Sequence, residues 1–298
     1  MAATRRKVIN NEVTHLGPYE LNKVERPLLT YYGSKWSVAD WIISFFPKHS
    51  IYVDVFGGSA CVLLKKPKQG TEVYNDINQD LVNLFRVVRD PIKAKQLADA
   101  IYLTPWSRVE FELAYEKIED EIERARRLLT RSFMGWGSTG ATSNPGFRWI
   151  ACNPEGTTSL NRFCNYLPRD IIDVCNRFKQ VQIENIDYKK LVERYDSPDT
   201  LFYFDPPYMH DTRVSTKVYE GEMSHQDHVE FLEIANNIKG LAVVSGYSND
   251  LYLDSLKDWG IHKKKSLSVN RDRGTFVECI WCHTNNRAAA KAQGVLAL

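Results

Sequence analysis

The stretch Leu201-Phe202-Tyr203-Phe204-Asp205-Pro206-Pro207-Tyr208 decides the fold of this chain. Its first four residues are apolar or aromatic without alternation, which is typical of a strand buried on both faces of a sheet. The two prolines cannot donate a ladder hydrogen bond, so the strand must end before them. The sequence therefore predicts a central strand that ends in a rigid, solvent-facing corner carrying a carboxylate and an aromatic ring.

Taken alone, this octet is equally compatible with an ordinary turn at the end of a strand, since Pro-Pro turns are common. The flanking sequence indicates more. Strand-like segments at 51–56, 72–76, 181–187 and 241–247 alternate with helical patterns, and a hairpin is expected from 266–269 and 276–282. Such alternation predicts one doubly wound α/β domain, in which ligands bind beyond the carboxyl ends of the strands.

Composition restricts the class of protein. The chain has 298 residues, of which 43% are hydrophobic, so one large domain or a domain with an insertion is expected. A net charge of only +2 excludes a uniformly basic nucleic-acid coat, and any basic site must be local. Six irregularly spaced cysteines, no signal-peptide pattern and no long apolar run favour a reducing cytoplasm and no membrane span.

Two turns are candidates for a ligand site. Gly57-Gly58-Ser59 follows a strand and opens a helix, where glycines let a ligand approach the backbone. The next strand ends at Asp76, the position at which an acid holds a ribose diol in nucleotide-binding units. Lys35 follows a Gly-Ser turn and suits a carboxylate or phosphate, although a solvated surface lysine gives the same pattern. The spacing is not that of the dinucleotide fingerprint.

Composition changes abruptly near residue 124. The segment 91–123 is helical and acidic, whereas 124–169 holds seven arginines and one acid, interleaved with aromatic residues, asparagines and glycines. Arginines suit phosphates, amides suit base edges and aromatic rings suit stacking, so this block is a candidate nucleic-acid surface. The alternative is an irregular segment whose arginines pair with the preceding acidic helix. The candidate DNA contacts are Arg124, Arg127, Arg131, Asn144, Arg148 and Arg162.

Two metal-like patterns are weak. Cys279-Ile280-Trp281-Cys282-His283 matches the haem attachment pattern, but haem attachment requires export, and no second Cys/His pair has the spacing of a zinc site. His225 and His228 lie one turn apart at a helix start, where packing is the better explanation. We therefore expect no metal.

Six motifs occur in the order of a known family. They are Tyr31-Tyr32-Gly33-Ser34-Lys35, Asp54-Val55-Phe56-Gly57-Gly58-Ser59-Ala60, Asn75-Asp76-Ile77-Asn78, Ile186-Asp187-Tyr188, Asp205-Pro206-Pro207-Tyr208 and Ser245-Gly246-Tyr247. Together they resemble the Dam-like class of DNA adenine-N6 methyltransferases, especially its phage-type branch, from about residue 28 to 284. Ser34 stands where the family often has a second glycine, and 130–135 matches only loosely.

The resemblance implies a Rossmann-like, S-adenosylmethionine-dependent methyltransferase sheet with an inserted, mostly helical or loop target-recognition domain. The implied domains are an N-terminal arm (1–27), a catalytic domain (28–90 and 170–286), the insertion (91–169) and a flexible tail (287–298). The implied catalytic residues are Asp205, Pro206, Pro207 and Tyr208. The implied cofactor contacts are Tyr31, Tyr32, Gly33, Lys35, Asp54, Phe56, Gly57, Gly58, Ser59, Asp76, Ile77, Asp187, Tyr188 and Asp205.

Within that set, Asp76 would hold the ribose hydroxyls of the cofactor. Lys35 and the Gly57-Gly58 turn would hold its methionine end. Asp187 and Tyr188 would contact its adenine ring. The implied partner is double-stranded DNA, bound by a monomer or weak dimer in a bacterial or phage-infected cytoplasm. A cognate restriction enzyme is a further candidate partner. Three alternatives stay open: another exocyclic amine as acceptor (cytosine N4, or adenine in RNA), a catalytically silent DNA-binding relative, and a small-molecule methyltransferase.

Overall fold

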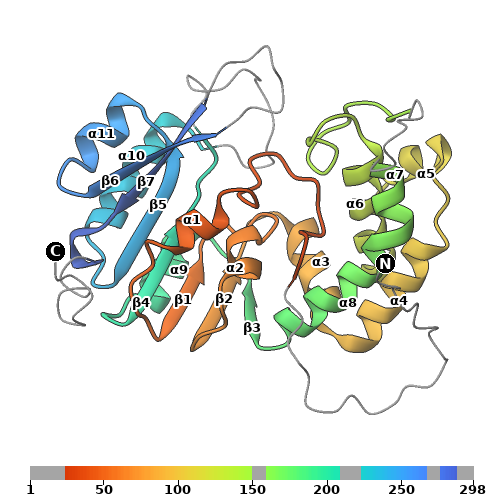
Figure 1. Cartoon of the computed structure of the whole chain (residues 1–298), viewed down its shortest axis with the longest axis horizontal. Helices are drawn as coiled ribbons and strands as arrows, with labels where there is room; N and C mark the ends of the chain where they lie inside the picture. Colours follow the sequence, from red (N-terminus) through yellow and green to blue (C-terminus); the bar gives the residue numbers. More distant parts are fainter. Residues whose placement is uncertain (1–23, 150–158, 209–222, 267–275, 287–298) are drawn as a thin grey trace, which may run out of the picture.

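A mixed sheet covered by helices on both faces forms the body of the molecule, and a group of helices extends from one side of it (Figure 1). The computed structural model describes residues 24–149, 159–208, 223–266 and 276–286. The predicted arm lies outside the described residues up to residue 23, and the predicted tail at 287–298 lies wholly outside them.

The described sheet has seven strands in the order β3-β2-β1-β4-β5-β7-β6. The strands are β1 (Ile51–Asp54), β2 (Thr71–Asn75), β3 (Val181–Glu184), β4 (Thr200–Phe204), β5 (Leu241–Tyr247), β6 (Gly260–Ser266) and β7 (Phe276–Cys282). The strands β1 to β5 run parallel to one another, whereas β7 runs antiparallel to both β5 and β6. The predicted α/β class and the central position of 201–204 are confirmed.

Helices connect the parallel strands, as the alternating pattern predicts. They are α1 (Ala39–Ile43), α2 (Cys61–Lys65), α3 (Gln79–Arg89), α4 (Pro91–Tyr102), α5 (Arg108–Leu113), α6 (Glu121–Met134), α7 (Ser159–Asn161), the π-helical η1 (Arg162–Tyr166), α8 (Leu167–Phe178), α9 (Tyr188–Tyr195), α10 (His225–Asn236) and α11 (Asp250–Ser255). Ser224 begins α10 in a capping box with Asp227, as the sequence predicts.

Side chains of each strand alternate between two cores. Tyr52 and Tyr203 face the core built with α1–α6 and α8, whereas Val53 and Phe202 face the core built with α9, α10 and α11. All five residues of β4 are buried, because this strand lies in the middle of the sheet with helices on both faces. The uninterrupted apolar run at 201–204 follows from that position.

Strand order reverses between β1 and β4, because the chain adds β2 and β3 on one side of β1 and β5 on the other side of β4. Asp54 ends β1 and has Tyr203 as its partner on β4, so Asp54 and Asp205 both lie at the carboxyl edge beside this switch point. In open α/β sheets the crevice at such a point is where ligands bind.

The terminal hairpin differs from the prediction in one strand. Its second strand is β7 as expected, but its first strand is β6 at 260–266, and 267–275 lies outside the described residues. The run His262-Lys263-Lys264-Lys265 does not read as a strand by its apolar pattern. It forms one because β6 is the edge of the sheet, where lysines are favoured since they discourage pairing with another chain.

The helices from α3 to α8 pack against one another as a helical unit beside the sheet (Figure 1). The unit contains most of the predicted insertion at 91–169, but α8, which begins at Leu167, packs on both α3 and α4. Phe85 of α3 stacks on Phe178 of α8, with 4.6 Å between ring centroids. The sheet domain and the helical unit therefore share a core.

Candidate active site

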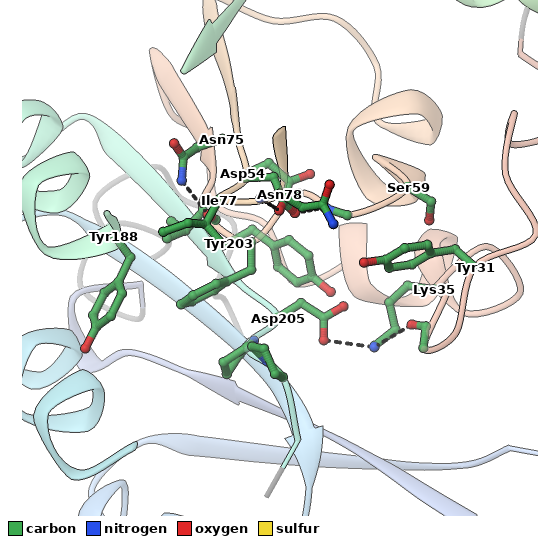
Figure 2. A pocket seen from close by; sticks show the side chains of 18 of the residues that line it. Tyr31, Lys35, Asp54, Ser59, Asn75, Ile77, Asn78, Tyr188, Tyr203 and Asp205 are labelled. Atoms are coloured by element: carbon green, nitrogen blue, oxygen red, sulfur yellow. Dashed lines mark hydrogen bonds and ion pairs between the residues drawn. The ribbon is translucent and has the colours of Figure 1, made fainter. Parts of the chain in front are cut away.

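A cavity of about 280 Å³ opens at the carboxyl edge of the sheet. All predicted cofactor and catalytic residues line it, from Tyr31 to Tyr208 in sequence. Figure 2 shows Tyr31 and Lys35 at one end, Tyr188 at the other, and Asp205 between them. The structure thus brings together segments that lie up to 177 positions apart, as the shared edge of parallel strands requires.

Asp205 follows β4 directly and is held on one carboxylate oxygen. Its Oδ1 lies 2.8 Å from Lys35 Nζ and accepts a hydrogen bond of 3.0 Å from Ser245 Oγ. The Ser245 hydroxyl in turn lies 2.9 Å from the Tyr203 hydroxyl. Within the described residues both contacts to Asp205 reach Oδ1, so Oδ2 is available to accept a hydrogen bond from a substrate.

Neither charged group of this pair is as exposed as the sequence suggested. The Asp205 side chain is 18% exposed and that of Lys35 is 6% exposed. The corner after β4 is therefore half-enclosed rather than solvent-facing, because Lys35 folds over it and also donates to the Gly33 carbonyl at 2.9 Å. The reading of Lys35 as a solvated surface lysine is wrong.

The Gly57-Gly58 turn brings backbone to the floor of the cavity. A Cβ on Gly57 would lie 2.2 Å from Tyr74 Cε2 and 2.9 Å from the Asn75 carbonyl oxygen, so no larger residue fits there. Gly58 has φ of +50°, which favours glycine, and a Cβ on it would meet the Tyr31 ring at 3.4 Å. The turn is fixed by the Tyr74 hydroxyl, which donates to the Gly58 carbonyl at 2.8 Å.

Asp76 joins this turn to the end of β2. Its two oxygens accept 2.8 Å hydrogen bonds from the backbone N–H groups of Gly58 and Asn78. Each oxygen keeps a lone pair, so the carboxylate can still accept two hydroxyl groups. Burial raises the pKa of the Asp76 carboxyl, and the backbone N–H donors act against that shift. The predicted ribose-binding acid is thus also a structural anchor of the glycine turn.

The opposite end of the cavity is aromatic. Tyr188 begins α9, and its ring lies 5.5 Å from that of Phe56 between centroids. Asp187 caps the same helix, because its side chain accepts a 2.9 Å hydrogen bond from the N–H of Lys189. This cap fixes the start of α9 and hence the position of Tyr188 after β3. Ile77 adds a 60% exposed apolar side chain at this end. Apolar and aromatic walls of this kind suit a flat heterocycle.

Three of the carboxylates that line the cavity, those of Asp54, Asp76 and Asp205, influence one another electrostatically. Burial, together with the charges of Asp205 and Asp76, raises the pKa of Asp54 well above its ordinary value. Burial also raises the pKa of the Asp205 carboxyl, although the Lys35 ammonium and the Ser245 hydroxyl oppose that shift. A cationic ligand would relieve this repulsion, so the cavity favours a bound positive charge.

Sequence reasoning missed three residues at the corner. Tyr203 and Ser245 hold Asp205 in place, and Glu278 of β7 accepts a 3.0 Å hydrogen bond from the Tyr208 hydroxyl. Ser245 belongs to the motif Ser245-Gly246-Tyr247, whose sequence does not indicate that its hydroxyl contacts Asp205. Glu278 was hidden in an apolar strand pattern, although an acid in a buried run is itself a signal, because an isolated buried carboxylate is costly.

Glu278 makes a testable contribution to stability. Burial raises the pKa of this carboxyl from 4.5 to about 7, with Lys35 opposing and Asp205 adding to the shift. The folded protein then binds more protons than the unfolded chain between about pH 4.5 and 7, so stability falls as pH rises through this window, by roughly 3 kcal/mol. Glu278→Gln should therefore raise the melting temperature relative to wild type more at pH 8 than at pH 5. A difference that is equal at both pH values would contradict this.

The arginine block is largely engaged within the protein. Arg124 Nε lies 2.6 Å from Asp80 Oδ1, and Arg131 pairs with the other oxygen of Asp80. Although partial burial acts to raise it, the contacts from Arg131 and Arg124 hold the pKa of Asp80 below its ordinary value. Arg127 lies 2.8 Å from Glu123 on the same helix. These contacts match the alternative reading of the sequence, in which the arginines pair with acidic residues of the protein. Glu123 belongs to the acidic segment 91–123, as that reading expects, whereas Asp80 belongs to α3.

The other candidate DNA contacts are Arg148 and Asn144, which belong to the loop after α6, and Arg162, which begins η1. Arg148 donates from Nε to the Gly135 carbonyl at 3.1 Å and from Nη2 to the Gly137 carbonyl at 2.7 Å. Arg162 donates to the Pro27 carbonyl, and Asn144 is exposed at the loop surface. Arg124 and Arg131 thus share Asp80, whereas Arg127, Arg148 and Arg162 each have other partners.

The metal-like patterns have structural partners. Cys279 and Cys282 are buried in β7, and the His283 backbone N–H donates to the Ala242 carbonyl at 3.0 Å. His228 is buried, with Nδ1 2.9 Å from the Tyr252 hydroxyl. No group of three or more metal-binding side chains occurs among the described residues, and no described helix is long and apolar enough to cross a membrane.

The seven-stranded sheet, its antiparallel seventh strand and the cavity at the switch point define a Rossmann-like methyltransferase. Residues 31–270 match the model of the D12 class of N6 adenine-specific DNA methyltransferases, and the chain belongs to this family. Curated proteins gave no match. Among solved structures, a Clostridium thermocellum protein titled as an rRNA methylase is similar, with 12% identity and a TM-score of 0.36 over 83% of this chain and 95% of that one.

Proposed function

We propose that this protein transfers a methyl group from S-adenosylmethionine to N6 of an adenine flipped out of double-stranded DNA. The observation that carries the proposal is the half-buried Asp205 carboxylate, held on one oxygen by Lys35 and Ser245 at the same cavity as Asp76. Membership of the family supports an adenine acceptor.

The residues of the cavity fit the proposed cofactor. Gly57 and Gly58 place backbone without side chains at the cavity, because a Cβ on Gly57 would clash with Tyr74, and Asp76 has lone pairs for two hydroxyl groups. Tyr188 and Ile77 would cover its adenine, and Tyr31 and Lys35 would lie at its methionine end. Three carboxylates suit its positive sulfonium. When bound, the cofactor supplies an electrophilic methyl group.

Asp205 would act on the amino group that accepts the methyl. An adenine amino nitrogen is a poor nucleophile, because its lone pair is delocalised into the ring. Asp205 Oδ2 and the carbonyl of Pro206 can each accept one of its hydrogens, which favours a pyramidal nitrogen with a localised lone pair. The contacts of Oδ1 to Lys35 and Ser245 fix the carboxylate in advance, so catalysis is positioning and electrostatics.

Tyr208 would bind the flipped base by stacking. Its ring follows the two prolines, whose fixed φ makes the corner rigid. The ring lies 4.8 Å from Lys35 Nζ and 4.5 Å from the centroid of the Tyr247 ring. An unstacked base can bind an aromatic face of this kind while its amino edge reaches Asp205.

We propose that the loop at 135–149 makes the DNA contact. It begins three residues after Ser132, whose hydroxyl bonds both backbone groups of Thr30, next to Tyr31 of the cavity. The loop is held by a bridge between Gly135 and Phe147, and it exposes Trp136 by 47%. Figure 1 shows it in yellow-green at the upper end of the helical unit. In this proposal the arginines of α6 support the loop rather than contact DNA.

This division of roles predicts different effects of two substitutions. Trp136→Ala should weaken DNA binding about tenfold, because loss of one stacking ring costs about 1–3 kcal/mol, without lowering the melting temperature. Arg131→Ala should lower the melting temperature, since it leaves Asp80 with one partner, but keep the salt dependence of DNA binding. If Arg131→Ala instead reduces the salt slope by about one unit with unchanged melting, Arg131 contacts phosphate and the α6 assignment is wrong.

Labelled cofactor tests the class of substrate. We expect the label from S-adenosylmethionine to enter double-stranded DNA and not structured RNA when both are supplied at equal concentration. Incorporation into RNA alone would replace DNA by RNA as the substrate. No incorporation into either polymer, from protein that still binds the cofactor, would favour a silent DNA-binding relative or a small-molecule substrate.

A further inference from the structure

Glu278 is a buried carboxylate behind the catalytic corner. It lies in the middle strand of β5-β7-β6, opposite Tyr247 on β5 and Lys264 on β6, and is 5% exposed. Directly opposed residues of antiparallel strands share a face of the sheet, so these three side chains form one row. The Lys264 ammonium lies over the Trp41 ring at 5.5 Å, which directs it away from Glu278.

Glu278 contacts Tyr208, the residue proposed to stack on the base. The Tyr208 hydroxyl donates to Glu278 Oε1 at 3.0 Å, while Tyr247 meets the same ring at 54° between planes. The ring is therefore held at its tip by Glu278, against one side by Tyr247, and at its root by the two prolines. Its orientation is set before any base arrives, which lowers the entropic cost of binding one.

Burying an ionised carboxylate at this position is energetically unfavourable. Glutamine would offer an amide oxygen as an acceptor in place of the carboxylate oxygen, without a charge to bury, and it has nearly the same shape. Burial destabilises the ionised form of Glu278, and the negative charge of Asp205 adds to the cost. Costly buried charges concentrate at functional sites, because stability alone does not favour them there.

We propose that Glu278 is a positioning residue, which holds the Tyr208 ring in the orientation that stacks the target base with its amino group against Asp205. The inference rests on the proposed methyl transfer to a flipped base and adds to it a residue outside the motifs of the corner. Among the described residues, the hydrogen bond of Glu278 goes to the Tyr208 hydroxyl, so the two residues should behave as one unit in kinetics.

Four variants test this coupling with purified full-length protein, oligonucleotide duplexes and labelled S-adenosylmethionine. Glu278→Ala should lower kcat/KM for DNA about tenfold and leave cofactor affinity within twofold of wild type. Tyr208→Phe keeps the ring but removes the hydroxyl, and it should show the same loss. The double variant should be no worse than either single one, because both remove the same hydrogen bond. Glu278→Gln should recover activity to within about threefold of wild type.

A matched control separates positioning from general loss of structure. Glu72 is also a buried carboxylate in a strand, paired with Lys66 and Arg177 away from the cavity. Glu72→Gln should lower the melting temperature and leave kcat/KM unchanged at a temperature where the variant is folded. A fluorescent 2-aminopurine at the target position gives a second readout, since stacking of the flipped base on Tyr208 would quench it in the wild-type complex relative to a complex in which the flipped base is unstacked. Glu278→Ala should lose most of that quenching.

The pH profile gives a readout that a structural role would not change. Protonated Glu278 accepts a hydrogen bond less well, so kcat/KM of wild type should decline as pH falls through about 7, and Glu278→Gln should lack this decline. Among the described residues, the titratable and charged groups that face Glu278 are Lys35, Asp205, Tyr208 and Tyr247, whereas Lys264 lies opposite it on β6 with its ammonium over Trp41. These groups are all present in Glu278→Gln, so a difference between the pH profiles of wild type and Glu278→Gln reports the titration of Glu278.

The outcomes distinguish this inference from the proposed function. If wild type methylates no nucleic acid, the proposed function is wrong and the inference falls with it. If wild type is active but Glu278→Ala keeps full kcat/KM and quenching, the inference alone is wrong. It is also wrong if the losses of Glu278→Ala and Tyr208→Phe multiply in the double variant, because the two residues would then act independently.

Discussion

Asp205→Ala should lower methyl transfer by at least about a hundredfold, because loss of one preorganised group that contacts the reacting atoms typically costs 10²–10³ in rate. The variant loses the acceptor at Oδ2 and leaves the Lys35 ammonium, 6% exposed, without its carboxylate. The positive charge of Lys35 would then lie beside the adenine amino group without the negative charge of Asp205 to balance it. Rates measured under single turnover with saturating cofactor check this expectation.

The fold should survive this substitution. The loss of the ion pair with Lys35 is offset by relief of repulsion, since the Asp205 charge raises the pKa of both Asp54 and Glu278. We therefore expect a melting temperature within a few degrees of wild type. Asp205→Asn is the matched control, because its amide oxygen keeps one acceptor and should retain traces of activity. Turnover close to wild type in Asp205→Ala, with unchanged melting, would show that Asp205 is not catalytic.

Asp76→Ala should weaken cofactor binding by much more than tenfold. Hydrogen bonds to a charged group contribute about 1.5–3 kcal/mol each, and Asp76 would accept two from the ribose. The same carboxylate fixes the N–H groups of Gly58 and Asn78, so its loss also frees the turn that approaches the cofactor. Titration calorimetry with S-adenosylmethionine measures the change directly.

A matched substitution tests the location of this effect. Asp80 lies four positions later, on the first turn of α3, and pairs with Arg124 and Arg131 instead of lining the cavity. Asp80→Ala should therefore lower stability and leave cofactor affinity within about twofold. Unchanged affinity in Asp76→Ala would remove Asp76 from the cofactor site.

The sequence predicted those parts of the fold that depend on local pattern. The unbroken apolar run at 201–204 identified the central strand, because only a strand covered on both faces has no polar alternation. Acids and glycines at the ends of predicted strands converged on one cavity, since parallel strands place their carboxyl ends together. The capping box at Ser224 followed from spacing alone.

Features that depend on distant contacts could not be predicted. The strand at 260–266 is formed by pairing with β7, and its lysines give no apolar signal. The arginines of α6 suggested a basic surface, but Asp80, some 44 to 51 positions away in sequence, accepts two of them. The roles of Ser245 and Glu278 arise only where β5 and β7 bring them to the corner after β4.

The most direct test of the central claim is the identity of the modified nucleoside. DNA from cells that lack adenine methylation, expressing either wild type or Asp205→Ala, would be digested and its nucleosides measured by mass spectrometry. If the protein methylates adenine N6 through Asp205, DNA from cells with wild type should contain N6-methyladenine and DNA from cells with Asp205→Ala should contain none. N4-methylcytosine in place of N6-methyladenine, or equal amounts of N6-methyladenine with both proteins, would contradict it.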